Sequence, residues 1–283
     1  MPDRCYSLNL MGGRVEIVLY NTEKHTADLI KEEIYDEALA LESIFNFFDP
    51  KSELSLLNLS RKKVVSSHLL KVIKSALIFC ELSNGAYDIS LGKLFKARKS
   101  GKDLPKLNCS YEDIEIKKNI ICLNNKEVMI DLGSIAKGYI ADCLVESMKN
   151  KGVCSGLIDA RGDIRIFGKI SEKISIQDPR IKGKTVTSFE LKNKAVATSG
   201  DYSQFYGSFD KSHIITNENI CSATVIYQDL MTADALSSVL FVSPPEVRKK
   251  VMSRFSKSRA FLINKHKKEE KYRWFKNTSY LLK

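Results

Sequence analysis

Apolar and polar residues follow two spacings along this chain, one typical of helices and the other of strands. Apolar residues three and four positions apart predict helices over 26–48, 69–79, 135–148 and 229–242. Alternating or β-branched apolar runs predict strands over 14–20, 127–132, 156–167, 173–177 and 188–197, and a hairpin of 259–263 with 272–276. The polar segment 96–110 contains Gly101 and Pro105 and is expected to form a surface loop.

These elements do not follow a regular strand–helix–strand order, which predicts an α+β fold rather than a doubly wound parallel sheet. No repeat or linker divides the chain, so a single domain over 1–283 is expected. Hydrophobic residues make up 43% of the chain and charged residues 28%, as in ordinary folded proteins. No stretch approaches the ~20 apolar residues of a membrane-spanning helix, so no integral membrane segment is expected.

The N-terminal residues 1–9 lack the apolar core of a signal peptide, and Cys5 lacks the hydrophobic lead-in of a lipid anchor. A cytoplasmic protein is therefore expected, or a periplasmic one if the natural N-terminus has been trimmed. The seven cysteines form no Cys-x-x-Cys pair, so neither a disulfide framework nor a zinc site follows.

The chain is basic, with 45 Lys and Arg residues against 34 acidic ones and a formal charge of +11. The cations are spread in short groups, which favours a generally basic surface over a nucleic-acid site. Positive charge would also assist the capture of a dinucleotide.

Two segments imitate nucleotide-binding motifs. The run 133–138 has the glycine spacing of a P-loop, but Tyr139 and Ile140 stand where Lys and Ser or Thr are required. Gly183-Lys184-Thr185 has the right ending, but Asp178 replaces the first glycine. There is no Gly-x-Gly-x-x-Gly either, so P-loop and Rossmann nucleotide sites are excluded.

Short clusters of Gly, Ser, Thr and Asp lie where predicted elements end, at 84–88, 131–134, 161–163 and 198–201. Each cluster alone is typical of a turn or a helix cap. The turn at 131–134 precedes a predicted helix that carries Lys137 in its first turn. Backbone N–H groups at a helix start together with a lysine suit a phosphate.

Asp234 is a carboxylate within an otherwise apolar helix, where burial without a partner is costly. Ser238 lies four residues further on, so both oxygens project from one face. Carboxylate and hydroxyl oxygens suit Mg²⁺. Alternatively, Asp234 caps a neighbouring turn or pairs with a lysine. His213, beside a Ser in a polar loop, is either a structural histidine or a catalytic one.

Eight motifs occur in a characteristic order: MGGRVEIVLY (11–20), SELSLLN (52–58), NGAYDISLG (84–92), IDLGSIAKGYIAD (130–142), GDIRIFG (162–168), AVATSGDY (195–202), SHII (212–215) and MTADALSSVLFV (231–242). Together they resemble the ApbE family of FAD:protein FMN transferases. The resemblance covers about residues 11–263, which leaves 264–283 as a basic C-terminal hairpin or tail.

The resemblance implies an α+β, T-fold-like architecture with mixed sheets, packed helices and a central FAD cleft. It implies FAD contacts by residues that match the family's motifs, namely Met11, Phe48, Ala86, Tyr87, Asp88, Asp131 and Lys137. It also implies that Mg²⁺ is held by Asp234, the hydroxyl of Ser238 and a backbone oxygen at Ser134.

The family's reaction moves FMN from FAD to a Thr or Ser hydroxyl of a target protein and releases AMP. By its match to SHII, His213 would be the base, and Asp201 would orient the site. The partners implied are FAD and an acceptor protein; nucleic acid is not expected.

The sequence departs from the family pattern at several positions. Residues 216–220 replace the usual Asp-Pro-x-Thr-Gly after SHII, which removes a carboxylate beside the proposed base. Ser238 replaces a Thr, Phe48 replaces a frequent Tyr, and Asp159-Ala160-Arg161 stands where Asn-x-Gly is commoner. The alternatives are therefore an FAD pyrophosphatase that uses water, a non-catalytic FAD-binding protein, favoured by the altered loop, and a basic nucleic-acid binder.

Overall fold

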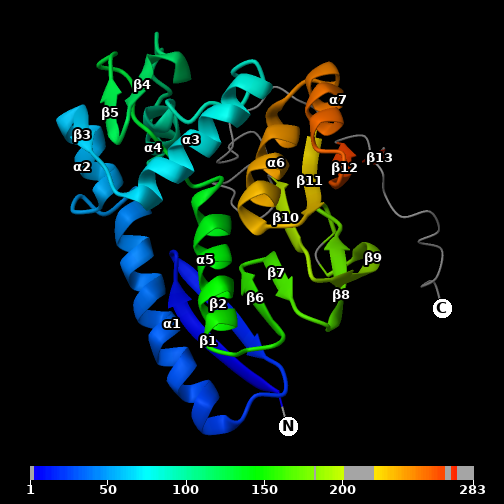
Figure 1. Ribbon diagram of the computed structural model, residues 1–283. Coiled ribbons are helices and arrows are strands. Elements are labelled where there is room, and N and C mark those ends of the chain that lie inside the picture. Colours follow the sequence, from blue (N-terminus) through cyan, green and yellow to red (C-terminus); the bar gives the residue numbers. More distant parts are fainter. Residues whose placement is uncertain (1–2, 182, 201–219, 265–268, 273–283) are drawn as a thin grey trace.

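The computed structural model describes residues 3–181, 183–200, 220–264 and 269–272 (Figure 1). A large sheet runs through the molecule, formed in spatial order by β1 (Arg4–Leu10), β2 (Gly13–Leu19), β6 (Gly156–Ala160), β7 (Asp163–Phe167), β10 (Ala195–Gly200), β11 (Ile220–Tyr227), β12 (Arg259–Asn264) and β13 (Glu269–Tyr272). Each neighbouring pair is antiparallel. Alternation explains β2, since Val15, Ile17 and Leu19 are buried and the residues between them are not.

Three helices cover one face of this sheet: α1 (Lys24–Phe45), α5 (Ala136–Asn150) and α6 (Leu230–Val242) (Figure 1). The buried stripe of α1 runs through Ile30, Ile34, Ala38 and Leu41, at the helical spacing seen in the sequence. Helix α6 is buried on nearly every side, which explains its almost continuous apolar sequence.

The part of the opposite face formed by β7, β10, β11 and β12 is covered by a two-stranded sheet of β8 (Ser171–Gln177) and β9 (Thr185–Lys192). Successive side chains of a strand point to opposite faces, so β7 contributes to two cores. Phe167 packs in the core beneath the helices, whereas Ile166 packs with Phe189 beneath β8 and β9.

A further group of elements, called the cap below, consists of α2 (Glu53–Ser60), β3 (Lys62–Val64), α3 (Ser67–Leu82), α4 (Gly92–Lys99), the 3-10 turn η1 (Tyr111–Asp113), β4 (Ile114–Lys117) and β5 (Ile120–Leu123). It lies beyond the upper ends of α1 and α5 in Figure 1. Leu54 and Leu69 belong to the same hydrophobic core as α1 and α5, so the cap is packed onto the rest of the molecule. Helix α7 (Pro245–Arg254) follows α6 and packs against α3.

The predicted α+β fold class is confirmed, and each of the four predicted helices is present. The strand expected over 127–132 is wrong, because this segment forms only an isolated bridge between Met129 and Leu91. The side chain of Asn58 takes the place of a second neighbouring strand, since it accepts from Ile130 N–H at 2.7 Å and donates to Ile130 O at 2.9 Å.

Two predicted strands are each divided in the structure. The run 156–167 turns at Arg161-Gly162 to give β6 and β7, and 188–197 turns at Asn193, where φ is 46°, to separate β9 from β10. The loop expected over 96–110 begins only after α4 ends at Lys99. The C-terminal hairpin forms, with Glu269–Tyr272 as its second strand, and residues 273–276 of the predicted strand lie outside the described residues.

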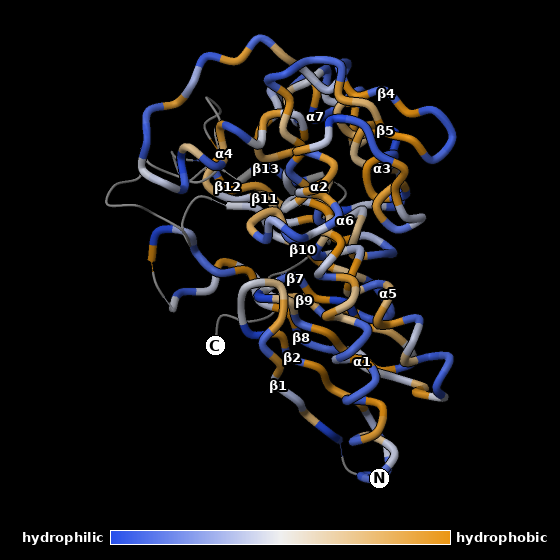
Figure 2. Tube along the Cα trace, turned by 90° about the vertical axis from the view of Figure 1, so that its left-hand side faces the viewer, coloured by the Kyte–Doolittle hydropathy of each residue, from blue (hydrophilic) through white to orange (hydrophobic). Residues whose placement is uncertain are grey.

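Hydrophobic and hydrophilic segments alternate along the trace in Figure 2, α1 and α5 included. Among the described residues, no helix combines the length and apolar character needed to cross a membrane.

Candidate active site

A cleft of about 710 Å³ opens between the cap, the end of α1 and the start of α5. Its volume is within the range of about 300–1,000 Å³ common for small-molecule and cofactor sites. Residues that the sequence assigned to FAD or Mg²⁺ line it: Met11, Phe48, Ala86, Tyr87, Asp88, Asp131, Ser134, Lys137, Asp234 and Ser238. The cleft therefore brings together residues that are far apart in the sequence. His213 and Asp201 lie outside the described residues.

The close approach of α5 and α6 positions the polar centre of the cleft. Gly138 makes this approach possible, because a Cβ there would lie 2.4 Å from the carbonyl oxygen of Leu230. Its N–H donates to Oδ2 of Asp234 at 3.3 Å. Helix α5 thus holds a carboxylate that projects from α6.

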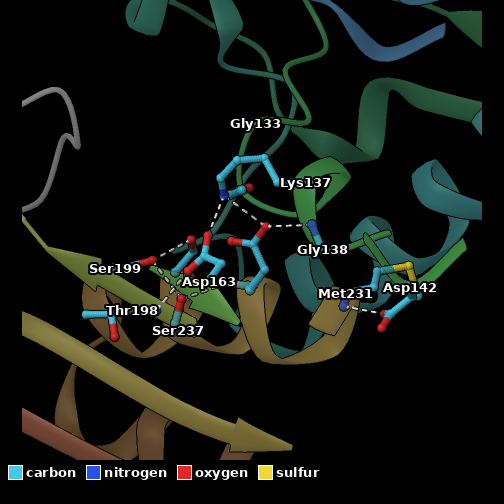
Figure 3. Close-up of polar contacts among 12 residues, drawn as sticks. Gly133, Lys137, Gly138, Asp142, Asp163, Thr198, Ser199, Met231 and Ser237 are labelled. Atoms are coloured by element: carbon cyan, nitrogen blue, oxygen red, sulfur yellow. Dashed lines mark hydrogen bonds and ion pairs between the residues drawn. The ribbon is translucent and has the colours of Figure 1, made fainter. Parts of the chain in front are cut away.

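The start of α6 is fixed by a second carboxylate of α5. Asp142 accepts from the N–H groups of Leu230 at 3.0 Å and Met231 at 2.8 Å (Figure 3). Asp229 caps the same helix by accepting from Thr232 N–H at 2.8 Å. These bonds satisfy N–H groups that a helix start leaves without partners, so α6 begins at a defined point and carries Asp234 in its second turn.

Lys137 lies between two carboxylates in the cleft (Figure 3). Its Nζ is 2.8 Å from Oδ2 of Asp163 and 3.2 Å from Oδ2 of Asp234. Burial alone would lower the pKa of Lys137, but the charges of Asp163 and Asp234 raise it above its ordinary value. Burial raises the pKa of Asp234, and Lys137 opposes that shift. Lys137 is therefore a permanent cation at this end of the cleft.

A chain of hydroxyl groups lies beside these charges. Ser199 Oγ is 2.8 Å from Ser237 Oγ and 2.9 Å from Ser238 Oγ. The N–H of Thr198 donates to Oδ1 of Asp163 at 3.1 Å, which ties the end of β10 to β7. Ser199 of β10 is thus bonded to two serines of α6, and Asp163 of β7 is bonded to the backbone of β10 (Figure 3).

The oxygens at this place fit a hard divalent cation. Asp234 is 3% exposed, and among the described residues no donor bonds its Oδ1, although the residue lines the cleft. Within the described ranges, no group of three His, Cys, Asp or Glu side chains could hold a metal alone. An ion here would combine one carboxylate with hydroxyl, backbone and phosphate oxygens, as Mg²⁺ commonly does.

The turn before α5 offers fewer backbone donors than the sequence suggested. Ala136 N–H donates to Leu132 O at 2.9 Å, Gly133 N–H donates to Asp131 Oδ1 at 3.0 Å, and Gly138 N–H is held by Asp234. The attraction of this turn for a phosphate therefore depends mainly on the side chain of Lys137.

The cap side of the cleft carries aromatic rings. Phe48 is 53% exposed and lies 5.3 Å from Phe47 and 6.0 Å from Phe95, measured between ring centroids. Lys99 Nζ lies 3.8 Å from the centroid of the Phe48 ring. This half of the cleft suits a flat ring of a ligand.

The remaining predicted cleft residues make bonds within the protein. Tyr87 is 6% exposed, and its hydroxyl lies 2.8 Å from Ser134 Oγ. The carboxylate of Asp88 accepts from Ser90 N–H at 2.8 Å and Tyr111 N–H at 3.0 Å, which orders the cap beside the cleft. Burial raises the pKa of Asp88, and these two N–H groups lower it.

Sequence reasoning left the roles of Asp163, Ser199 and Asp142 undetected, although each lies in a quoted motif. Asp163 follows a glycine turn and looks like a turn residue, and only the fold brings it to Lys137. The sequence allowed Asp234 to bind a metal or to pair with a lysine. In the structure it pairs with Lys137 and also lies among oxygens that fit a cation.

Comparison with known proteins agrees with this architecture. A sequence model of the ApbE family matches residues 11–262. The chain is 28% identical to the FAD:protein FMN transferase of Vibrio cholerae over 77% of this chain and 72% of that protein. It is 26% identical to the FAD:protein FMN transferase of Escherichia coli K12 over 82% and 75%.

Solved structures share the fold. The ApbE protein of Thermotoga maritima aligns with a TM-score of 0.83 at 26% identity, over 95% of this chain and 97% of that one. The flavin transferase ApbE from Vibrio cholerae aligns with a TM-score of 0.81 at 23% identity, over 95% and 96%. Because the family match spans most of the sequence, this chain belongs to the ApbE family.

Proposed function

We propose that this protein transfers FMN from FAD to a Thr or Ser hydroxyl of a target protein and releases AMP. Its relatives in Vibrio cholerae and Escherichia coli are named FAD:protein FMN transferases. The observation that carries the proposal is the convergence, in one cleft, of ten residues assigned to FAD and Mg²⁺ from the sequence.

The transfer is a phosphoryl-group reaction. The acceptor oxygen forms a bond to the phosphorus on the FMN side of the diphosphate, and the bond from that phosphorus to the bridging oxygen breaks. AMP leaves with the electron pair, so negative charge grows on its phosphate. The proton of the acceptor hydroxyl passes to a base, and His213 is our candidate for it.

Lys137 places one cation where the diphosphate would lie, and its two carboxylate partners are the reason that a divalent cation is also needed there. Lys137 is kept protonated by Asp163 and Asp234 and is held in place by both. A fixed cation of this kind stabilises developing negative charge without having to reorient. Asp234, Ser238 and a backbone oxygen at Ser134 would hold Mg²⁺, which would neutralise charge on the diphosphate and on the departing AMP.

Aromatic residues at the cap side would bind a flat ring of FAD. Phe48 exposes about half of its surface, and Phe95 lies next to it. Buried Tyr87 instead orients Ser134 through its hydroxyl. The cleft thus offers surfaces for the two kinds of group in a dinucleotide, flat rings and charged phosphates.

Release of AMP by the purified protein tests the proposal. The protein is incubated with FAD and Mg²⁺, alone, with a library of Thr- and Ser-containing peptides, and with a matched library in which Ala replaces both. We expect AMP and covalently flavinylated peptide only with the Thr and Ser library.

Other results would identify other functions. Release of AMP at the same rate without peptides would indicate an FAD pyrophosphatase. Binding of FAD with no AMP under any condition would indicate a non-catalytic FAD-binding protein. Failure to bind FAD, with salt-dependent binding of DNA or RNA, would indicate a nucleic-acid binder.

A further inference from the structure

Arg161 occupies a backbone conformation that arginine rarely adopts. It is the first residue of the two-residue turn between β6 and β7, with φ of 63°, and Gly162 follows with φ of 93°. Positive φ at both positions is typical of a type I′ turn, which favours Asn or Gly first. A non-glycine residue held there is strained, so surrounding contacts must fix it.

Those contacts are made with the turn between β1 and β2. Arg161 Nη1 donates to the carbonyl oxygen of Gly12 at 3.2 Å. Its side chain also lies across Gly13, where a Cβ would come within 2.6 Å of Arg161 Cδ. The guanidinium is therefore held at the edge of the cleft, which both Gly12 and Arg161 line.

The other cations that line the cleft have partners. Lys137 is paired with Asp163 and Asp234, and Lys99 lies over the ring of Phe48. Arg161 has no carboxylate within ion-pair distance among the residues that the structure describes, and its bond to Gly12 uses one of five N–H donors. A positioned guanidinium with unused donors is suited to a phosphate or a carboxylate.

The position of the turn favours a phosphate. Asp163 begins β7 two residues after Arg161, and it bonds both Lys137 Nζ and Thr198 N–H. Arg161 therefore lines the cleft close in sequence to the carboxylate that pairs with Lys137. A ligand with its diphosphate beside Lys137 would bring phosphate oxygens toward the Arg161 turn.

We propose that Arg161 binds a phosphate oxygen of the dinucleotide and thereby contributes to the selection of a diphosphate ligand. This inference rests on the proposed function, because it takes FAD as the ligand of the cleft.

Equilibrium binding without an acceptor tests the role of Arg161. Affinities for FAD, ADP and riboflavin, which lacks phosphate, are measured in Mg²⁺ for the wild type and for Arg161→Gln, Arg161→Lys and Arg161→Gly. We expect Arg161→Gln to bind FAD and ADP about tenfold more weakly, as for the loss of a charge-assisted hydrogen bond, and riboflavin with unchanged affinity. The affinities of Arg161→Lys for FAD and ADP should lie between those of the wild type and those of Arg161→Gln.

The variants also separate binding from folding. Glycine adopts this positive φ without strain, so Arg161→Gly should be at least as stable as the wild type. It should still bind FAD and ADP weakly, because it lacks the guanidinium. The matched control is Arg14→Gln, because Arg14 pairs with Glu16 of the same strand, β2, and does not line the cleft. It should leave all three affinities unchanged.

Three outcomes would overturn the inference. The first is that Arg161→Gln binds FAD and ADP as tightly as the wild type does. If this variant also needed a higher concentration of acceptor peptide for transfer, the guanidinium would contact the acceptor instead of the phosphate. An equal loss of riboflavin affinity would indicate a packing role. A wild type that bound neither FAD nor ADP would instead refute the proposed function on which the inference rests.

Discussion

Lys137 separates two carboxylates that would otherwise repel each other within the cleft. Asp163 and Asp234 both place Oδ2 within 3.2 Å of its Nζ, and the charge of Asp163 is one cause of the raised pKa of Asp234. Buried charges of this kind need partners with good geometry, and removal of one partner leaves the others uncompensated. The arrangement pairs Asp234 with Lys137 and leaves its carboxylate where it could bind a cation.

Replacement of Asp234 by Asn tests its role as a metal ligand. Asparagine keeps the size of the side chain and removes its charge, while Lys137 keeps Asp163 as a partner. We expect Mg²⁺-dependent AMP release to fall at least about 100-fold, with the free energy of unfolding within about 2 kcal/mol of the wild type. Asp36→Asn, at an exposed position on α1, is the control. An Asp234→Asn enzyme that kept its rate and its need for Mg²⁺ would remove the metal assignment.

Replacement of Phe48 by Ala tests whether the aromatic residues of the cleft bind a ring of FAD. Because half of its surface is exposed, Phe48→Ala should cost little stability. Loss of an aromatic contact of about 0.5–1.5 kcal/mol should weaken FAD binding about three- to tenfold. Fluorescence titration with FAD measures this, with Leu59→Ala as the control, since Leu59 is 80% exposed and does not line the cleft. Equal FAD affinity of the wild type and Phe48→Ala would place the ring-binding surface elsewhere.

At the scale of elements, the site depends on how α5 meets the start of α6. Gly138 lets the helices approach, and Asp142 fixes where α6 begins. Both residues belong to α5, so this helix determines the position of Asp234 although Asp234 is on α6. Changes at the junction should therefore alter the site without touching any residue assigned to FAD or Mg²⁺.

Gly138→Ala tests whether close packing of α5 against α6 or helix propensity has the larger effect on stability at this position. Alanine favours a helix over glycine by about 1 kcal/mol, so propensity alone predicts a more stable protein. Here the added methyl would meet the backbone of Leu230, and we expect a loss of about 1–3 kcal/mol from overpacking together with weaker FAD binding. Chemical denaturation and FAD titration measure the two effects, with exposed Glu146→Ala in the same helix as the control. A stabilised Gly138→Ala protein would contradict the close contact.

Asp142 predicts a specific pH dependence of stability. Burial raises its pKa from 3.8 to about 6 in the folded protein, against the opposing effect of the N–H groups of Leu230 and Met231. Between these values the folded protein keeps a proton that the unfolded chain has lost, so this group makes stability fall as pH rises. Asp142→Asn lacks the titration. The free energy of unfolding of the wild type minus that of the variant should fall by about 1–3 kcal/mol from pH 4 to pH 7.

Denaturant titrations at several pH values measure this difference directly. Asp142→Asn also loses one carboxylate oxygen at the start of α6, and this loss changes the free energy of unfolding by the same amount at every pH. The prediction therefore concerns only how the difference between wild type and variant changes with pH. A difference that stayed flat would show that Asp142 keeps its ordinary pKa in the folded protein, and one that grew with pH would show a lowered pKa; either result would contradict the prediction.

At the scale of the whole molecule, the cleft is assembled from the cap, the helical layer and the ends of strands in the large sheet. Periodicity predicted α1, α3 and α5 because their buried faces carry the pattern, whereas α6 is apolar on nearly every side. It also singled out Asp234, since a carboxylate and a hydroxyl four residues apart in an apolar helix are unusual. These are local signals that the chain displays without its fold.

Features that depend on contacts between distant segments could not be predicted from such signals. Asp163 gains its role from Lys137, and Asp142 from the N–H groups of α6. The segment at Ile130 looks like a strand in the sequence because Val128, Ile130 and Leu132 alternate as buried residues. In the structure the side chain of Asn58, distant in the sequence, supplies the hydrogen bonds of a missing neighbouring strand. The roles of FAD-contacting residues came from the resemblance to a family and not from the pattern.

A crystal structure of the protein with FAD and Mg²⁺ tests the central claim most directly. We predict the diphosphate of FAD beside Lys137, a metal ion bonded to Asp234 and Ser238, and one flat ring against Phe48. FAD bound outside the cleft, or a cleft that holds neither FAD nor a metal ion at saturating FAD and Mg²⁺, would contradict the account.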